Sequence, residues 1–284
     1  MTVGDNHHFF PERFLKNFFG KKNGIRFYDK DTKKISAERN VNSIAKKKYL
    51  YSVSYGDRKD NSLESEFQKI EDRFFPILEK ITEGTRPVYE NEVFALVEFS
   101  IFLSLRTPTI VEMANNAMKE ERIYKNVITS ILDEGIPVGL AEEFGKLLLS
   151  CEGMSYLHVL PYMLEQRIKL SSENYKVVML TCFGVHPKFV LGDTYMICNF
   201  LEPHKQPSEM YNLFMEKVEI IFPISENVCV LLSPKKAEES NKLIPNKSLT
   251  IEEILRLNSI IAGQSEKYIY SGNKLELMRI SSLL

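Results

Sequence analysis

The sequence predicts an α+β fold, a single domain with a helical middle and an antiparallel sheet from the N- and C-terminal segments. In residues 1–60 apolar and polar side chains alternate in short runs, which is typical of half-buried strands. In residues 61–170 apolar side chains recur at three- and four-residue steps, which is typical of helices. In residues 171–284 short apolar runs bounded by Gly and Pro return. No repeat, low-complexity segment or flexible linker divides the chain, so one domain over residues 1–284 is expected.

The N-terminal segment is predicted to contain strands and a short basic element. Residues 25–29 alternate as a strand does, residues 29–34 have the composition of a hairpin loop, and residues 35–38 fit the returning strand. Residues 42–48 are interpreted as a basic helical turn. The aromatic run of residues 49–53 is interpreted as a further strand.

Two helices dominate the predicted middle of the chain. The first begins at Ser62 with an N-cap and acidic first turn, and its apolar face extends to Ile81, with Pro76 as a point of kinking or division. The second, residues 91–105, is apolar nearly all round and is expected at the centre of the core. Pro108 then breaks or kinks the chain. Further helical patterns cover residues 112–134, 141–149 and 156–170.

The C-terminal segment is predicted to supply most of the sheet. Its strand-like runs are residues 175–182, 189–193, 218–223 and 227–234, and a tight turn joins the last two. A final helix is expected over residues 251–266, followed by a strand at 268–270.

Composition indicates a globular protein without a strong overall charge. Hydrophobic residues make up 44% of the 284 positions, charged residues 26%, and the net charge is −1. Residues 1–60 nevertheless hold 14 Lys and Arg against seven Asp and Glu, whereas the remainder holds 23 against 31. This asymmetry either provides a basic surface for an anionic partner or reflects two parts that pack together in one fold.

Three features predict a cytoplasmic protein that does not cross a membrane. No run approaches 18 uninterrupted apolar residues, and the N-terminus lacks the basic and apolar regions of a secretory signal. The cysteines are widely spaced without a C-x-x-C pair, so they are expected to be reduced and buried. They are Cys151, Cys182, Cys198 and Cys229.

The adjacent histidines His7 and His8 are the first candidate for chemistry, because imidazole titrates near neutral pH and binds metals. Neighbouring residues of a strand point to opposite faces, so one histidine is expected to enter a site while the other packs or caps. The spacing from His8 to Pro11 resembles the start of the motif of ββα-metal nucleases, but no Asn and His pair follows at that motif's spacing. A purely architectural role for the pair stays open.

Three charged positions in apolar surroundings complete the predicted site. Glu64 and Glu71 lie two helical turns apart, so they can project from one side of a helix and hold a divalent cation, or form a solvated face. Arg106 follows an almost uncharged helix and needs a carboxylate or anionic ligand if it is buried. Asp193, at the end of a strand, is either a functional acid, a turn residue or the ion-pair partner of Arg106.

The chain resembles an uncharacterised, mainly bacterial family, catalogued as domain of unknown function 4238. Residues 6–18 carry the most specific likeness, to the family's opening pattern HH-x-x-P-x-x-x-L-x-x-F. The resemblance extends over residues 6–235, but Thr194 and Tyr195 follow Asp193 where the family usually has Asn-Pro. The other similar segments are residues 27–30, 41–52, 63–71, 105–108, 190–193 and 232–234. The resemblance implies no activity.

The leading hypothesis is a metal- or His-dependent hydrolase of a phosphodiester or nucleotide. Its catalytic residues would be His7, His8, Arg106 and Asp193, with Glu64 and Glu71 holding Mg²⁺ or Mn²⁺. The alternative is a module that binds nucleic acid or senses an effector without turnover, with phosphate contacts from Arg13, Lys46, Lys47 and Lys48. The sequence lacks the G-x-G-x-x-G, P-loop, G-x-S-x-G and H-E-x-x-H motifs, which argues against the corresponding enzyme classes.

Overall fold

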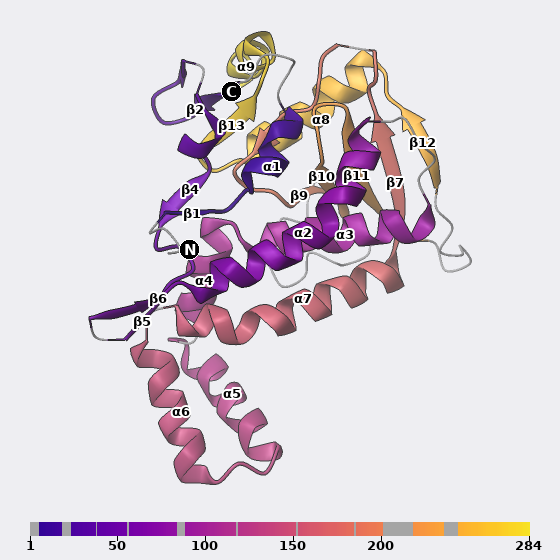
Figure 1. Cartoon of the computed structure of the whole chain (residues 1–284). Helices are drawn as coiled ribbons and strands as arrows, with labels where there is room; N and C mark the ends of the chain where they lie inside the picture. Colours follow the sequence, from indigo (N-terminus) through magenta and orange to yellow (C-terminus); the bar gives the residue numbers. More distant parts are fainter. Residues whose placement is uncertain are drawn as a thin grey trace.

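The predicted α+β class is confirmed by the computed structural model (Figure 1). Helices form the middle of the chain, and strands come from both ends. The structure describes residues 6–18, 24–37, 39–55, 57–83, 89–117, 119–151, 153–184, 186–200, 218–235 and 244–284.

Three long helices form one layer of the molecule. They are α2 (Ser62–Glu83), α3 (Glu90–Leu105) and α7 (Met154–Asn174). The nearly all-apolar α3 contacts both others and is buried from Phe99 to Leu105, as its composition predicts. Pro76 lies inside α2 without dividing it, because the helix continues for 22 residues.

A five-stranded sheet lies behind this helical layer, in the order β12-β7-β11-β10-β9. Neighbouring strands are antiparallel except β12 and β7, which are parallel. The sequence-based interpretation found β7, β10 and β11 but missed β9 and β12. The strands are β7 (Tyr175–Thr181), β9 (Ile197–Phe200), β10 (Val218–Pro223), β11 (Val228–Pro234) and β12 (Ile244–Ser248).

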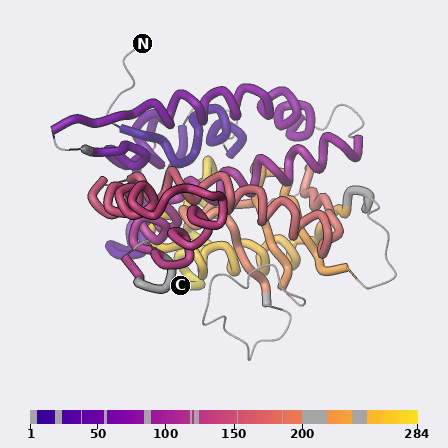
Figure 2. The backbone as a smooth tube through the Cα atoms, turned by 90° about the horizontal axis from the view of Figure 1, so that it is seen from below, coloured from indigo at the N-terminus to yellow at the C-terminus, as the bar shows by residue number. Residues whose placement is uncertain are grey.

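The sheet is buried on both faces, which explains its nearly continuous apolar runs. Val177 and Met179 of β7 pack into the core shared with α2 and α3. Their neighbours Val178 and Leu180 point to the opposite face, where they pack with Ile254 and other residues of α8 (Ile251–Gln264). The tube in Figure 2 shows the resulting order of layers, with α2, α3 and α7 on one side of the strands and α8 on the other.

A second sheet joins the two ends of the chain in the order β3-β2-β13-β8, all antiparallel. The predicted hairpin is confirmed, although its returning strand is Lys34–Ile35 instead of residues 35–38, of which residue 38 lies outside the described residues; its first strand pairs with the predicted C-terminal strand. The strands are β2 (Arg26–Asp29), β3 (Lys34–Ile35), β8 (Leu191–Gly192) and β13 (Tyr268–Ser271), and α9 (Lys274–Ser281), which the sequence did not reveal, follows β13.

Two small sheets flank the helical layer and correct part of the N-terminal prediction. Residues 46–48 form a strand instead of a helical turn, and Tyr49 to Tyr51 form a turn instead of a strand, because Tyr49 has a φ of 57°. The pairs are β1 (Asn6–His8) with β4 (Lys46–Lys48), and β5 (Val53–Tyr55) with β6 (Arg58–Asp60). Short helical turns connect them: α1 (Glu12–Leu15), η1 (Lys16–Phe18) and η2 (Val41–Ser43).

The helical pattern of residues 112–134 corresponds to parts of two helices, α4 (Pro108–Ala117) and α5 (Glu121–Asp133). Pro108 begins α4, a position where its missing N–H is tolerated. The next helix, α6 (Val138–Ser150), packs antiparallel to α5, and this pair projects from the body of the molecule (Figure 1).

Among the described residues, no single helix has both the length and the apolar composition needed to cross a membrane. The pair α3 and α4 meets these criteria only when taken together, and it is bent by 66°. The four cysteines are free and buried, as predicted.

Candidate functional site

Arg106 lies at the C-terminal end of α3, and its side chain is only 1% exposed. Three aromatic rings surround the guanidinium, with its carbon 4.6 Å from the ring centroid of Phe67 and 5.3 Å from those of Tyr51 and Phe102. Cation–π attraction in such a desolvated place favours the charged guanidinium. The helix end, which carries no other charge, therefore buries a full positive charge inside the helical layer.

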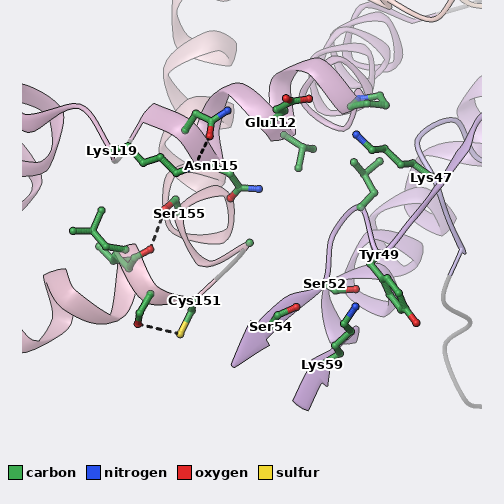
Figure 3. Close-up of a pocket in the computed structure, with 18 of the residues that line it drawn as sticks. Lys47, Tyr49, Ser52, Ser54, Lys59, Glu112, Asn115, Lys119, Cys151 and Ser155 are labelled. Carbon is green, nitrogen blue, oxygen red and sulfur yellow. Dashed lines mark hydrogen bonds between the residues drawn. The ribbon is translucent and has the colours of Figure 1, made fainter. Parts of the chain in front are cut away.

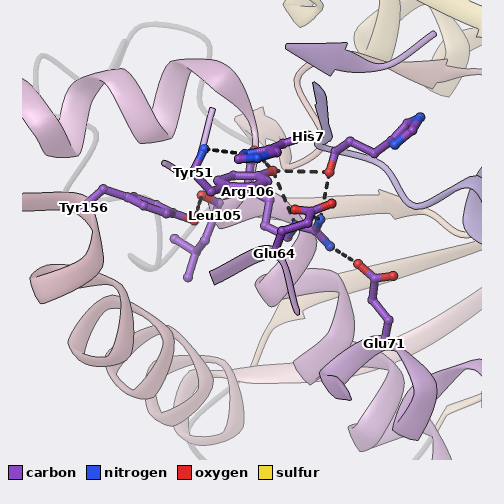
Figure 4. Close-up of polar contacts among 8 residues, drawn as sticks. His7, Tyr51, Glu64, Glu71, Leu105, Arg106 and Tyr156 are labelled. Carbon is purple, nitrogen blue, oxygen red and sulfur yellow. Dashed lines mark hydrogen bonds and ion pairs between the residues drawn. The ribbon is translucent and has the colours of Figure 1, made fainter. Parts of the chain in front are cut away.

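Two glutamates of α2 neutralise this charge, as Figure 4 shows. Nη1 of Arg106 forms a hydrogen-bonded ion pair with Glu71, and Nη2 lies 3.7 Å from the carboxylate of Glu64. Nη2 also donates a hydrogen bond of 2.7 Å to the carbonyl oxygen of His8. The seven-residue spacing of the glutamates thus brings both to one cation, and the two carboxylates that the sequence suggested as metal ligands face Arg106.

The pKa values of all three groups are raised, but for different reasons. Burial raises the pKa of Glu64 and of Glu71 above the usual range, although Arg106 acts against this shift. Burial alone would lower the pKa of Arg106, but Tyr51 and the two glutamates outweigh it and raise that pKa. Among the described residues, no group of three or more His, Cys, Asp or Glu side chains lies as a metal ion would require.

His7 and His8 point to opposite sides of β1, as the strand geometry predicts. His7 is fully buried; its Nδ1 accepts a hydrogen bond of 3.0 Å from the backbone N–H of Tyr51, and its ring stacks on that tyrosine. His8 is half-buried, and burial lowers the pKa of its imidazole, with Lys46 and Arg106 adding to the effect and Glu12 opposing it. One histidine therefore belongs to the packed interior, and the other has a neutral ring near the surface.

Asp193 lies apart from this cluster and holds the loop that leads into β13. Its carboxylate accepts three hydrogen bonds of 2.8 Å, from the backbone N–H groups of Glu266, Lys267 and Tyr268. Burial raises the pKa of Asp193, against the effect of these three donors. The suggested ion pair between Arg106 and Asp193 is wrong, because the acidic partners of Arg106 come from α2.

The remaining predicted contact residues divide between two places. Arg13 forms an ion pair of 2.7 Å with Glu79 and lies over the ring of Phe75. Its guanidinium is therefore bound to side chains of α2. Lys46, Lys47 and Lys48 are exposed along β4. Among the other histidines, His158 packs against Phe144, His186 is exposed, and His204 falls outside the described residues.

A cavity of about 650 Å³ opens beside β4 and is the second feature of the site. One wall consists of β4 and the β5–β6 hairpin, and includes Lys47, Lys48 and Lys59. Figure 3 shows Lys47, Tyr49 and Lys59 on this wall. It shows Glu112, Asn115 and Lys119 on a second wall, formed by α4 and the residues that follow it. The end of α6 and the start of α7 close the third side.

The cavity is strongly positive. Four lysines line it (Lys47, Lys48, Lys59 and Lys119), and Glu112 is the one acidic residue among its described lining residues. None of these lysines forms an ion pair with a carboxylate of the described residues. Lys59 instead lies 3.3 Å from the ring centroid of Tyr49, and Lys119 donates to Asn116 at 2.8 Å. Their charges are therefore available to an anionic ligand.

The buried cluster and the cavity share the segment around Tyr51. Tyr51 and Tyr156 stack at 6.1 Å, and the Tyr156 hydroxyl donates to the carbonyl of Leu105, beside Arg106. The backbone N–H of Tyr156 donates to Asn115 of the cavity wall. Gly153 precedes α7 with a φ of 86°, and a Cβ there would lie 2.2 Å from the backbone oxygen of Ser52. A glycine is thus required for α7 to begin against the wall of the cavity.

The sequence indicated the lysines of β4 as contact residues, but it did not indicate the residues on the other sides of this cavity. The run Lys46 to Lys48 is visible as a cluster of like charges. Lys59 and Lys119 are separated by 60 positions and lie in ordinary polar surroundings. The helical spacing of Glu112 and Asn115 on α4 gives them a shared face, but nothing local indicates that this face borders a cavity.

The comparisons with known proteins agree with the N-terminal signature. The sequence model of the family described as "Protein of unknown function (DUF4238)" matches residues 6–274, so the chain belongs to this family. The match includes the histidine pair, Arg106 with both glutamates, and every lysine of the cavity. No curated protein and no solved structure matches the chain.

Proposed function

We propose that this protein is a binding module for a phosphate-bearing ligand, a nucleotide or the backbone of a nucleic acid, held in the cavity beside β4. The observation that carries the proposal is the presence of four lysines and one glutamate around about 650 Å³. Ammonium groups bind phosphate as point charges, and a recessed cluster of one sign raises the local concentration of an anion. Binding of this kind requires no catalytic group.

The size and surroundings of the cavity suit this ligand class. Cavities of roughly 300–1,000 Å³ hold small organic ligands, so one nucleotide, or one unit of a nucleic-acid chain, is of suitable size. Leu50, Val111 and Leu148 supply apolar surface for the organic part. Lys46 is exposed on the same strand as Lys47 and Lys48 and adds one more positive charge near the cavity, although it does not line it.

Hydrolysis, the other function that the sequence suggests, has weaker support. Glu64, Glu71 and Arg106 converge, but they bind one another in the interior and do not line the cavity. Groups that act on a substrate must lie within hydrogen-bonding reach of it. His8, with its neutral ring, remains the candidate base of this second proposal, which predicts that Mg²⁺ or Mn²⁺ supports cleavage of a nucleotide and that His8→Ala abolishes it.

The binding proposal is tested with two fluorescent probes, mant-ATP and a fluorescein-labelled single-stranded oligonucleotide. The variant Lys47→Gln/Lys59→Gln removes two charges from the cavity, and Lys274→Gln removes one exposed charge that does not line it. The double variant should weaken binding about tenfold or more, corresponding to about 1.4 kcal/mol. Its affinity should also depend less steeply on salt, because fewer counterions are released.

The result also separates the two forms of the ligand. Binding of mant-ATP alone identifies a nucleotide site, and tighter binding of the oligonucleotide identifies a nucleic-acid surface. Equal affinities of the wild type and Lys47→Gln/Lys59→Gln for both probes would show that the cavity is not the binding site. A matching loss in Lys274→Gln would show that the probes respond only to overall charge.

A further inference from the structure

We infer that the ligand of the lysine-lined cavity is a nucleotide whose base carries an amino group beside a ring nitrogen, as adenine and cytosine do, and that Glu112 and Asn115 recognise this edge. The inference rests on the proposed function and names the part of the ligand that the lysines do not explain. It starts from the one acidic side chain in a cavity that is otherwise positive.

A carboxylate at this place opposes a ligand that consists only of phosphate. Glu112 is exposed and lines the same cavity as the lysines, and no ion pair with a described residue neutralises it. Like charges repel a polyphosphate, whereas a carboxylate accepts hydrogen bonds readily from the amino group of a base. Glu112 therefore favours a ligand that presents a donor as well as phosphates.

Asn115 supplies the complementary group one helical turn further along α4. Its Oδ1 already accepts the N–H of Tyr156 at 3.0 Å, so the amide nitrogen, a donor, is the part of the side chain left for a ligand. Residues three apart on a helix lie on one face with their Cβ atoms roughly 5–6 Å apart. The α4 wall thus places an acceptor beside a donor.

An acceptor beside a donor is complementary to one hydrogen-bonding edge of particular bases. Adenine and cytosine present an amino donor beside an unprotonated ring nitrogen, which an acceptor and a donor can bind together. Hypoxanthine presents a carbonyl oxygen in place of the amino group, so its oxygen would face the carboxylate of Glu112. Lys47 and Lys59 lie on the opposite wall, where they can contact the phosphates of the same ligand (Figure 3).

The test compares ATP with inosine triphosphate, which differs in this edge of the base, and with inorganic tripolyphosphate, by calorimetry without divalent cations. The wild type should bind ATP about tenfold more tightly than inosine triphosphate. Glu112→Ala should reduce this preference to within about twofold, because it removes the acceptor for the amino group, and it should strengthen tripolyphosphate binding, because it removes a negative charge. Glu165→Ala, an exposed change on α7 outside the cavity, should alter neither.

The outcomes distinguish this inference from the function on which it rests. If the wild type binds ATP, inosine triphosphate and tripolyphosphate equally, the base is not read and the inference fails, while phosphate binding stands. If the preference for ATP persists in Glu112→Ala, other residues recognise the base and the assignment to Glu112 is wrong. If none of the three binds, and both fluorescent probes also fail to bind, the proposed function fails together with the inference.

Discussion

Two hydrogen bonds join the side chain of Tyr51 to Arg106. Nε of Arg106 donates to the Tyr51 hydroxyl at 3.4 Å, and that hydroxyl donates to the backbone carbonyl of Arg106 at 2.8 Å. Through His7, the backbone of Tyr51 is also tied to β1. One tyrosine therefore joins the N-terminal strand, the end of α3 and, through the adjacent Leu50 and Ser52, the wall of the lysine-lined cavity.

Replacing Arg106 by methionine should strongly destabilise the fold. The change leaves Glu64 and Glu71 in the interior without a cation, and breaking a buried ion pair from one side costs about 3–5 kcal/mol. Denaturant unfolding measures the loss. Arg256→Met, an exposed change on α8, should alter stability by about 0.5 kcal/mol or less.

A triple variant shows whether charge causes that loss. Arg106→Met/Glu64→Gln/Glu71→Gln removes the cation and both acids, so it should recover part of the stability that the single change loses. A triple variant no more stable than Arg106→Met would contradict the electrostatic explanation and would point to the packing of the guanidinium among Tyr51, Phe67 and Phe102.

Stability should depend on pH through Glu64. Its pKa in the folded protein is raised by burial above the ordinary value of 4.5, so folding favours the protonated form. The stabilising contribution is fully present below pH 4.5 and is lost as the pH rises through the raised pKa. Glu64→Gln mimics the protonated acid and leaves Arg106 paired with Glu71. It should raise the melting temperature relative to the wild type at neutral pH, and the gain should vanish towards pH 4.

The comparison with Glu71 sharpens this prediction. The pKa of Glu71 is raised by burial as well, so Glu71→Gln should show the same pH trend, but its gain at neutral pH should be smaller because the change also breaks the direct ion pair with Arg106. Equal effects of the two substitutions at every pH would contradict the assignment of separate roles to the two acids.

His7→Ala should destabilise the protein more than His7→Asn does. Alanine removes both the acceptor for the N–H of Tyr51 and the stacked ring, and a buried N–H left without a partner costs about 1–3 kcal/mol. Asparagine keeps an acceptor at a position similar to that of Nδ1. Thermal unfolding should rank the wild type first, His7→Asn second and His7→Ala third. His8→Ala leaves the Tyr51 bond in place, so a loss as large as that of His7→Ala would contradict this ranking.

Asp193 should prove structural. Asp193→Ala deprives three backbone N–H groups of their acceptor and should cost about 4.5 kcal/mol or more, since hydrogen bonds to charged groups are each worth about 1.5–3 kcal/mol. Asp193→Asn keeps one oxygen, which can serve Lys267 and Tyr268, and should cost less. Both variants should retain the affinity of the wild type for mant-ATP, because Asp193 does not line the cavity. Loss of binding in a folded Asp193→Asn would contradict the structural role.

Much of the fold follows from local patterns in the sequence. The apolar composition of α3 predicts its central position, the run of Val and Ile in β10 and β11 predicts buried strands, and the hairpin of β2 and β3 follows from its turn composition. The local patterns predicted the wrong structure at β4 and at Tyr49. The strand β4 depends on its pairing with β1, and the positive φ of Tyr49 depends on contacts with residues distant in sequence. The two-residue β3 and β8 are likewise held by their neighbours in the sheet.

The sequence by itself determined which residues carry unusual chemistry: a histidine pair, a charged residue at the end of an apolar helix, two glutamates in helical register and a run of lysines. Only the tertiary structure decided what these residues do. Burial of Arg106 turned Glu64 and Glu71 from possible metal ligands into its counter-ions, because a buried cation requires nearby negative charge. The placement of α4 across the cavity from β4 and the β5–β6 hairpin brought Lys59, Lys119 and Glu112 to one cavity. Charge and periodicity are local properties, whereas a cavity depends on how distant segments pack.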